Sequence, residues 1–158
     1  MSLETRVSIA EAEQLVKEAF LRNGVKEAVA VSVSTALVAA EAEGQVGHGF
    51  SRVKDYLAQV KSKKINVDAK IQIEHPKPTS ISIDADYGFA YPALDQAISE
   101  GALTAKEYGS AIVSIFNSHH CGALSVQVEK IANQGLIGVM MANTPKAIAP
   151  WGGKDPFF

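Results

Sequence analysis

The chain has 158 residues, of which 47% are hydrophobic and 20% charged, so it is long enough to form one domain with a buried core. Its formal net charge is −2 with both signs interspersed, and no basic stripe is present to neutralise the phosphates of a nucleic acid. No apolar stretch is long enough to span a bilayer, the N-terminus does not resemble a signal peptide, and the single cysteine, Cys121, excludes an internal disulfide. A cytoplasmic protein without nucleic-acid or membrane partners is therefore expected.

Three helices are predicted in the first part of the chain. The first covers residues 8–23, begins with the Ser-x-x-Glu pattern of a capping box, and is followed by Gly24, which suits the turn that ends a helix. The second covers residues 26–43 and is rich in alanine and valine, which indicates packing on more than one side. The third runs from about residue 51 to residue 62.

After residue 64 the pattern changes to strands and helices in alternation. Residues 70–74 and 80–84 alternate apolar and polar side chains, as half-buried strands do, and the sequence His-Pro-Lys-Pro at 75–78 is expected to break the chain between them. The elements expected next are a helix at 92–108, a buried-type strand at 111–116, a helix at 123–134 and a buried-type strand at 136–142.

This order of elements is typical of an α/β fold. The change of pattern predicts a helical subdomain at residues 1–65, followed by an α/β portion at residues 66–158. The seam between them is expected at residues 65–69.

The first candidate site is the loop Gly47-His48-Gly49-Phe50-Ser51-Arg52, between two predicted helices. Glycines on both sides of His48 allow the backbone to approach a ligand closely. Arg52 is expected on roughly the same side, and its guanidinium suits a carboxylate because it can donate two parallel hydrogen bonds. The alternative is a surface loop whose histidine caps a helix, and the spacing alone slightly favours that alternative.

The second candidate site is the loop Asn117-Ser118-His119-His120-Cys121-Gly122, which follows a predicted strand. Ligands of α/β proteins generally bind at the carboxyl ends of strands, and a histidine there can move a proton to or from a substrate hydroxyl. The alternative is a polar loop in which Asn117 or Ser118 caps the next helix. Metal binding by His119, His120 and Cys121 fits poorly because adjacent side chains on an extended loop diverge. No glycine-rich phosphate-binding motif is present.

Three segments resemble the malate/L-lactate dehydrogenase family, and the resemblance runs along essentially the whole chain. They are GHGFSR at 47–52, NSHHCGA at 117–123 and ANTPKAIAPWGG at 142–153. This family includes ureidoglycolate, sulfolactate and diketogulonate oxidoreductases and is unrelated to the Rossmann-fold lactate dehydrogenases. The resemblance implies that residues 66–158 are the first part of a mixed-sheet, non-Rossmann domain that binds NAD or NADP. It also implies that residues 1–65 serve substrate binding and dimerisation.

The same resemblance implies a role for five residues. The family's catalytic histidine falls on His120, which would exchange a proton with the substrate hydroxyl while a 2-hydroxyacid such as malate or lactate is interconverted with its 2-oxoacid. His48 would hydrogen-bond the substrate oxygen, and Arg52 would hold the substrate carboxylate. Tyr56, one helical turn beyond Arg52, would join them, and Thr144 would contact the nicotinamide cofactor. The resemblance implies a homodimer and no metal site.

Two departures from the family pattern bear on function. Gly47 stands where the family usually has serine, so a hydroxyl that could contact the substrate or orient His48 is absent. The sequence also ends just before the family's G-T-N-P segment, so the chain is expected to be the N-terminal half of a typical member. The alternative functions are a truncated, catalytically silent module for binding or oligomerisation and, less favoured, a small metalloprotein.

Overall fold

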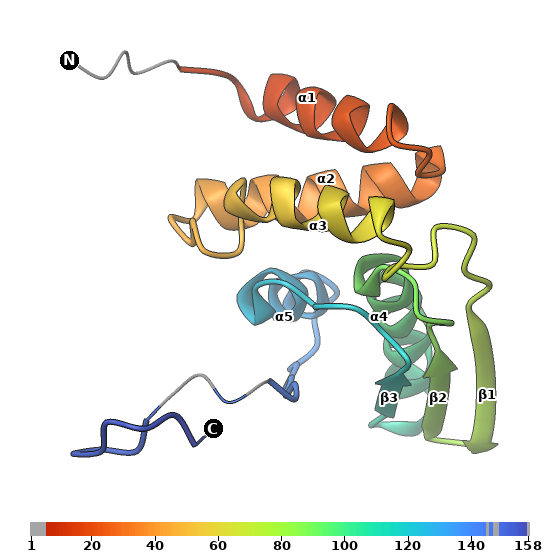
Figure 1. Ribbon diagram of the computed structural model, residues 1–158. Helices are drawn as coiled ribbons and strands as arrows, with labels where there is room; N and C mark the ends of the chain where they lie inside the picture. Colours follow the sequence, from red (N-terminus) through yellow and green to blue (C-terminus); the bar gives the residue numbers. More distant parts are fainter. Residues whose placement is uncertain (1–5, 145, 147–148, 158) are drawn as a thin grey trace.

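The computed structural model describes residues 6–144, 146 and 149–157, and its helices and strands form a mixed α/β structure (Figure 1). This confirms the predicted fold class. The elements in chain order are α1 (Ile9–Leu21), α2 (Glu27–Ala42), α3 (Ser51–Lys61), β1 (Gln72–Lys77), β2 (Ser80–Asp84), α4 (Ala90–Tyr108), β3 (Ile112–Phe116) and α5 (Leu124–Ala132).

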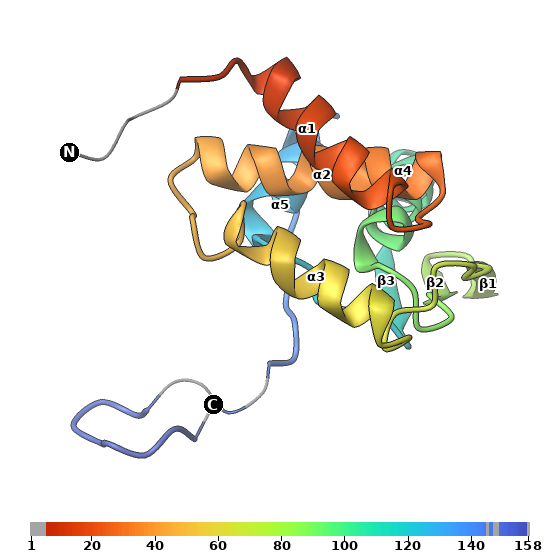
Figure 2. The ribbon, with the colours of Figure 1, turned by 45° about the horizontal axis from the view of Figure 1, so that its top comes forward.

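The helices stack in layers around α2. The capping box predicted for the first helix is present, because the Ser8 hydroxyl accepts from the Glu11 amide while the Glu11 carboxylate accepts from the Ser8 amide. As its composition indicates, α2 is covered on more than one side: α1 packs against it, and α4 and α5 lie across from α1 (Figure 1). Figure 2 shows α3 beside α2. Phe20, Leu37 and Tyr56 from these helices are almost fully buried in one core.

The sheet has three strands in the order β1-β2-β3. β2 is antiparallel to β1 and parallel to β3, and α4 forms the crossover between the parallel pair. A second, smaller core lies between this helix and the sheet, where Ile81 and Ile83 of β2 pack against Ala93 and Ala97 of α4. The arrangement places the ends of β2 and β3 beside the N-terminus of α4, where the candidate site is found.

Three predictions about strands are wrong. The segment at 75–78 does not break the chain, because β1 continues through Pro76 to Lys77. A proline is tolerated there because β1 is an edge strand and its pairing with β2 is irregular between Glu74 and Lys77. β3 is also not fully buried, since Ile112 is 75% exposed at the other edge of the sheet.

The third error concerns residues 136–142, which are not a strand in the described part of the chain. Their side chains alternate as in a strand, with Ile137, Val139 and Met141 more than 80% exposed. A strand requires a neighbour to pair with its backbone groups, and none of the described strands lies beside this segment. The apolar run was therefore an incorrect sign of both a strand and its burial.

The boundary predicted between residues 1–65 and 66–158 stays a prediction. The larger core contains residues from both sides of it, including Phe89 and Leu94. None of the helices in the described ranges combines the length and the apolar character that crossing a bilayer requires.

Candidate active site

The loop that carries His120 is fastened at the ends of β2 and β3. Asn117 follows β3 with a left-handed backbone (φ 49°), and its side-chain amide donates to the carboxylate of Asp84, the last residue of β2, over 3.1 Å. The Asn117 carbonyl accepts from the amide of Tyr87 at 2.6 Å, and Tyr87 is itself left-handed (φ 55°). The amide of His119 donates to the Gly88 carbonyl at 3.1 Å. The backbone that carries the two histidines is therefore held by hydrogen bonds to three residues, Asp84, Tyr87 and Gly88.

His120 is partly exposed, and the contacts of its ring fix one nitrogen. The Tyr56 hydroxyl lies 2.7 Å from Nδ1, and the Gly122 amide donates to the same atom over 3.3 Å. An amide N–H is always a donor, so Nδ1 is an acceptor in this arrangement. Burial lowers the pKa of His120 below its ordinary value, and the positive charge of Arg52 and the neighbouring His48 lower it further. His120 is thus held as a neutral imidazole at neutral pH.

His48 reaches His120 from the other loop. The two rings are stacked, with their centroids 5.5 Å apart and their planes 17° from parallel. The loop is held to α2 through Glu41, whose carboxylate accepts from the Phe50 amide at 2.8 Å. Gly49 makes this approach feasible, since a Cβ at that position would collide with the Glu41 side chain. By contrast, the space around Gly47 is open.

Arg52 lies at the start of α3 and is directed back over the loop. Its Nε donates to the Gly47 carbonyl at 2.6 Å, which leaves the terminal nitrogens of the guanidinium for another acceptor. Its charge acts on both His120 and Tyr56. The structure therefore brings together four of the predicted site residues, namely His48, Arg52, Tyr56 and His120.

His119 and His120 are adjacent in sequence but have different surroundings. The His119 ring packs edge-on against Tyr56 and Phe89, and its Nε2 is 2.8 Å from the side-chain oxygen of Gln59. Its Nδ1 is buried without a hydrogen-bond partner among the described residues. Burial, with a smaller contribution from His120, lowers the pKa of His119 to about 4. His119 is a packed neutral residue behind the site.

The sequence analysis missed Tyr91, and it named Gly122 in the second loop without giving it a role. Tyr91, near the start of α4, is 1% exposed, and its hydroxyl lies 3.1 Å from that of Tyr56. Gly122 is left-handed (φ 72°), and a Cβ on it would lie 2.6 Å from the Tyr91 hydroxyl. No motif marks Tyr91, since it lies in an otherwise apolar helix start, whereas the glycine two residues after His120 was a usable sign of close packing.

The remaining expectations have mixed outcomes. Asn117 and Ser118 do not cap a helix, because α5 begins at Leu124 with Ala123 as its N-cap. Thr144 is exposed on the segment that follows α5, and its contact with a cofactor stays a prediction. Burial raises the pKa of the Cys121 thiol. Cys121 is therefore a poor nucleophile, because the thiolate is the reactive form. Within the described ranges, no three histidine, cysteine or acidic side chains gather as metal ligands would.

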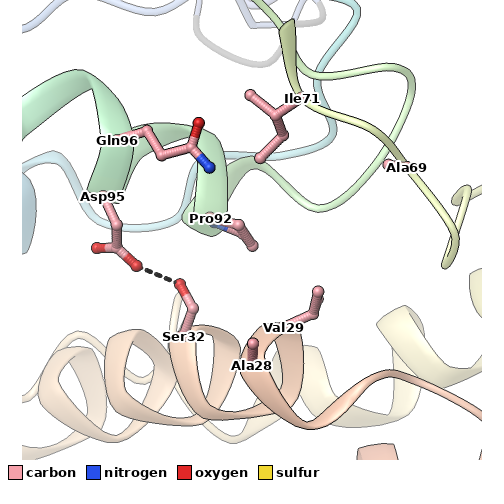
Figure 3. Close-up of a pocket in the computed structure, with 8 residues that line it drawn as sticks. All are labelled: Ala28, Val29, Ser32, Ala69, Ile71, Pro92, Asp95 and Gln96. Carbon is pink, nitrogen blue, oxygen red and sulfur yellow. Dashed lines mark hydrogen bonds between the residues drawn. The ribbon is translucent and has the colours of Figure 1, made fainter. Parts of the chain in front are cut away.

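A surface pocket of about 390 Å³ lies away from the histidines, between α2, the start of α4 and the chain before β1 (Figure 3). Its one charged side chain is Asp95, which accepts from the Ser32 hydroxyl and from Lys130 at 2.7 Å, so the carboxylate is already used in joining helices. Because its one titratable side chain is engaged in this way, we place the candidate site at the histidines. The residues that line the pocket are Ala28, Val29, Ser32, Ala69, Ile71, Pro92, Asp95 and Gln96.

Comparison with known proteins identifies the family. The family model for malate/L-lactate dehydrogenase matches residues 7–158. The (2R)-3-sulfolactate dehydrogenase (NADP(+)) of Chromohalobacter salexigens is 38% identical over 152 residues, which cover 96% of this chain and 45% of that protein. The ureidoglycolate dehydrogenase (NAD(+)) of Escherichia coli O157:H7 is 29% identical over 153 residues, 97% of this chain and 44% of that protein.

The fold agrees with this assignment. The crystal structure of Δ1-piperideine-2-carboxylate reductase from Pseudomonas syringae pv. tomato matches with a TM-score of 0.80 and 32% identity, over 84% of this chain and 40% of that one. The chain thus spans less than half the length of the relatives it matches, which are dehydrogenases and reductases named for NADP or NAD where a cofactor is given. On the match of its sequence along almost its entire length, the chain belongs to the malate/L-lactate dehydrogenase family.

Proposed function

We propose that this chain carries the acid–base and carboxylate-binding half of an NAD(P)-dependent oxidoreductase that interconverts a 2-hydroxyacid and its 2-oxoacid. The observation that carries the proposal is the cluster itself: a neutral, partly exposed imidazole at His120, stacked on His48 and lying within the field of the Arg52 guanidinium. A proton carrier beside a carboxylate-binding cation is what a substrate of the form R–CH(OH)–COO⁻ requires.

His120 is assigned the proton transfer. Its Nδ1 is engaged by Tyr56 and Gly122, so Nε2 is the nitrogen that we assign to the substrate oxygen. In oxidation, His120 takes the proton of the substrate hydroxyl as hydride leaves the same carbon; in reduction, it returns that proton to the carbonyl oxygen. Because the pKa of His120 is lowered, its neutral form predominates at neutral pH.

Arg52 is assigned the substrate carboxylate. Its Nε is fixed on the Gly47 carbonyl, so the guanidinium is held in place before substrate binds. A guanidinium held in this way can form charge-assisted hydrogen bonds to a carboxylate without first losing side-chain freedom. His48, stacked on His120, is placed to hydrogen-bond the substrate oxygen from the other loop.

A bound nicotinamide supplies or accepts the hydride. The described residues fit that chemistry to the extent that His120 is partly exposed, as a residue that serves both a substrate and a cofactor must be. We propose Thr144, on the exposed segment after α5, as a contact to the cofactor. The relatives include both an NADP(+) and an NAD(+) enzyme, so the proposal covers either cofactor.

Assembly and location are also proposed. We propose a homodimer in the cytoplasm, with malate or lactate as the model substrates, on the resemblance to the family. Sedimentation of the purified protein tests the oligomeric state, and a monomer at micromolar concentration would contradict it. No relative named above fixes the substrate, since their names cover sulfolactate, ureidoglycolate and a cyclic imine carboxylate.

The test is a hydride-transfer screen on two proteins: the 158-residue chain, and the product of the whole reading frame that contains it. Each is assayed by NAD(P)H absorbance against 2-oxoacids, cyclic imine 2-carboxylates and both nicotinamides. We expect turnover with a 2-oxoacid from a product that extends to the length of the relatives, and weak or no turnover from 158 residues alone. Absence of turnover from both would favour the alternative of a catalytically silent binding or oligomerisation module.

A further inference from the structure

Two buried hydroxyl groups form a chain that ends on His120. Tyr91 of α4 and Tyr56 of α3 are each 1% exposed, and their hydroxyl oxygens are 3.1 Å apart. The Tyr56 hydroxyl continues to Nδ1 of His120 over 2.7 Å. Gly122 closes against the Tyr91 hydroxyl so tightly that no Cβ fits between them. Three separate elements thus converge on these two hydroxyls, although both side chains are almost fully buried.

One arrangement of the hydrogens gives every donor of this chain an acceptor, with the single lone pair of Nδ1 shared between two donors. The Gly122 amide donates to Nδ1, so Nδ1 carries no proton. The Tyr56 hydroxyl then donates to Nδ1 as well, and the Tyr91 hydroxyl donates to the Tyr56 oxygen. In the opposite arrangement, Nδ1 donates to Tyr56 and Tyr56 donates to Tyr91. That arrangement leaves the Gly122 amide and the Tyr91 hydrogen without these acceptors, which is unfavourable for buried donors.

We infer that Tyr56 and Tyr91 are positioning residues, whose buried hydroxyl chain holds neutral His120 as the tautomer with its proton on Nε2. This changes the role expected for Tyr56, because a side chain that is 1% exposed and bonded at its hydroxyl on both sides acts through His120 rather than on the substrate. The importance of the hydroxyl chain for catalysis rests on the function proposed above. The assignment of the tautomer does not rest on that function.

The tautomer has a chemical consequence. With its proton on Nε2, neutral His120 presents a hydrogen-bond donor to a substrate carbonyl oxygen. To take a proton on Nε2 from an alcohol, His120 must first change tautomer by exchange with water, which removes the proton on Nε2 and supplies one to Nδ1. Both hydroxyls then turn, so that Nδ1 donates to Tyr56 and Tyr56 donates to Tyr91. Hydroxyl groups can rotate in this way, whereas an amide N–H in place of Tyr56 could not. The pair therefore favours one tautomer while leaving the other accessible.

Other charged and titratable groups also face His120. They are Arg52 on α3, His48 on the preceding loop, and His119 and Cys121 on its own loop. None of these changes when a tyrosine is replaced by phenylalanine, which keeps the ring and removes one oxygen. The substitutions Tyr56→Phe and Tyr91→Phe therefore isolate the hydroxyl chain.

The test is nitrogen-15 NMR of the histidine side chains in the 158-residue chain, which needs neither cofactor nor turnover. We expect the wild-type His120 signals to show protonated Nε2 and unprotonated Nδ1 at pH 8. In Tyr56→Phe, the protonated imidazole loses the acceptor for its Nδ1–H, so the pKa of His120 should fall by roughly 0.5–1 unit, a three- to tenfold loss of proton affinity. Tyr91→Phe should lower the pKa less, because it removes only the second link behind the charge.

The matched control is Tyr87→Phe, which removes a hydroxyl from a side chain that is 65% exposed and should leave the His120 titration unchanged. A wild-type tautomer with its proton on Nδ1 would overturn the inference, as would Tyr56→Phe and Tyr91→Phe variants that unfold at the wild-type temperature and titrate like the wild type. If the inference holds but no product of the reading frame transfers hydride, then the proposed function fails and the assignment of the tautomer stands.

Discussion

The two histidine loops are built in different ways. The loop at residues 117–122 is fastened by Asp84, Tyr87 and Gly88, and His120 is further held at Nδ1. The loop at 47–52 is held by Glu41 and by the bond from Arg52 to Gly47, with open space around Gly47. Under the proposed function, the fixed loop would carry the proton-transfer group and the more open loop would carry the contacts that vary with the substrate.

The largest effect should come from His120→Ala. In a product of the reading frame that transfers hydride, we expect kcat to fall about 10²–10⁴-fold, the usual contribution of a positioned proton carrier. His119→Ala should cost far less, since His119 packs behind Tyr56, and His75→Ala on exposed β1 serves as a control without effect. Equal losses from His119→Ala and His120→Ala would reverse the assignment of the two neighbours.

The open loop is tested next by Arg52→Met, which keeps an unbranched side chain and removes the guanidinium with its charge. We expect KM for a 2-oxoacid to rise about 10- to 100-fold, since a hydrogen bond to a charged group contributes about 1.5–3 kcal/mol. Lys54→Met, on an exposed position of the same helix, is the matched control. An unchanged KM would mean that the carboxylate is held elsewhere.

A third experiment asks how firmly the open loop is held. Gly49→Ala places a Cβ against the Glu41 side chain, so the loop must shift and its bond from Phe50 to Glu41 is strained. We expect the free energy of unfolding to fall by about 1–3 kcal/mol in a urea titration. A variant as stable as the wild type would show that the loop can shift without lowering the free energy of unfolding.

The fixed loop should make stability depend on pH. The pKa of His119 is about 4 in the folded chain, below the value of 6.5 expected when unfolded, and that of His120 is also lowered. The unfolded chain therefore binds more protons between these values, and stability present above pH 6.5 is lost as the pH falls toward 4. We expect the thermal midpoint to fall over this range, and His119→Gln to weaken the dependence. A midpoint with the same pH slope in both proteins would remove His119 as its cause.

The smallest effect on stability is expected from Gly47→Ser, which introduces the serine that the resemblance implies at this position. Nothing lies within 4 Å of the new Cβ, so the free energy of unfolding should change by less than about 0.5 kcal/mol. Activity against the panel of 2-oxoacids and cyclic imines is the informative measurement. A changed order of preference would support a substrate contact at this position, whereas an unchanged order would assign specificity to other parts of the site.

The helices could be predicted from the sequence because their signals are local. Apolar periodicity and the Ser8–Glu11 capping box depend on neighbours within one or two turns. The strand errors arose where pairing decides the outcome: Pro76 is tolerated because β1 is an edge strand, and residues 136–142 lack a strand beside them. Periodicity describes how apolar and polar side chains alternate along a segment. It carries no information about which strand, if any, pairs with that segment.

The candidate site shows the same limit. His48, Arg52 and His120 were indicated by residue type and by resemblance, and the structure brings them together. The Tyr56–Tyr91 contact joins residues 35 positions apart and could not be found from spacing. The resemblance separated His120 from His119, whereas residue type and spacing alone could not, since the difference depends on which ring reaches the Tyr56 hydroxyl.

The left-handed backbone at Tyr87 has a consequence for laboratory evolution. A bulky residue in this conformation is disfavoured by about 1 kcal/mol relative to glycine, and the Tyr87 side chain is largely exposed. Random libraries screened for heat resistance should therefore accumulate glycine or asparagine at position 87, where the amide bonded to Asn117 is retained whatever the side chain. Robustness can be selected there without altering any atom that faces the histidines.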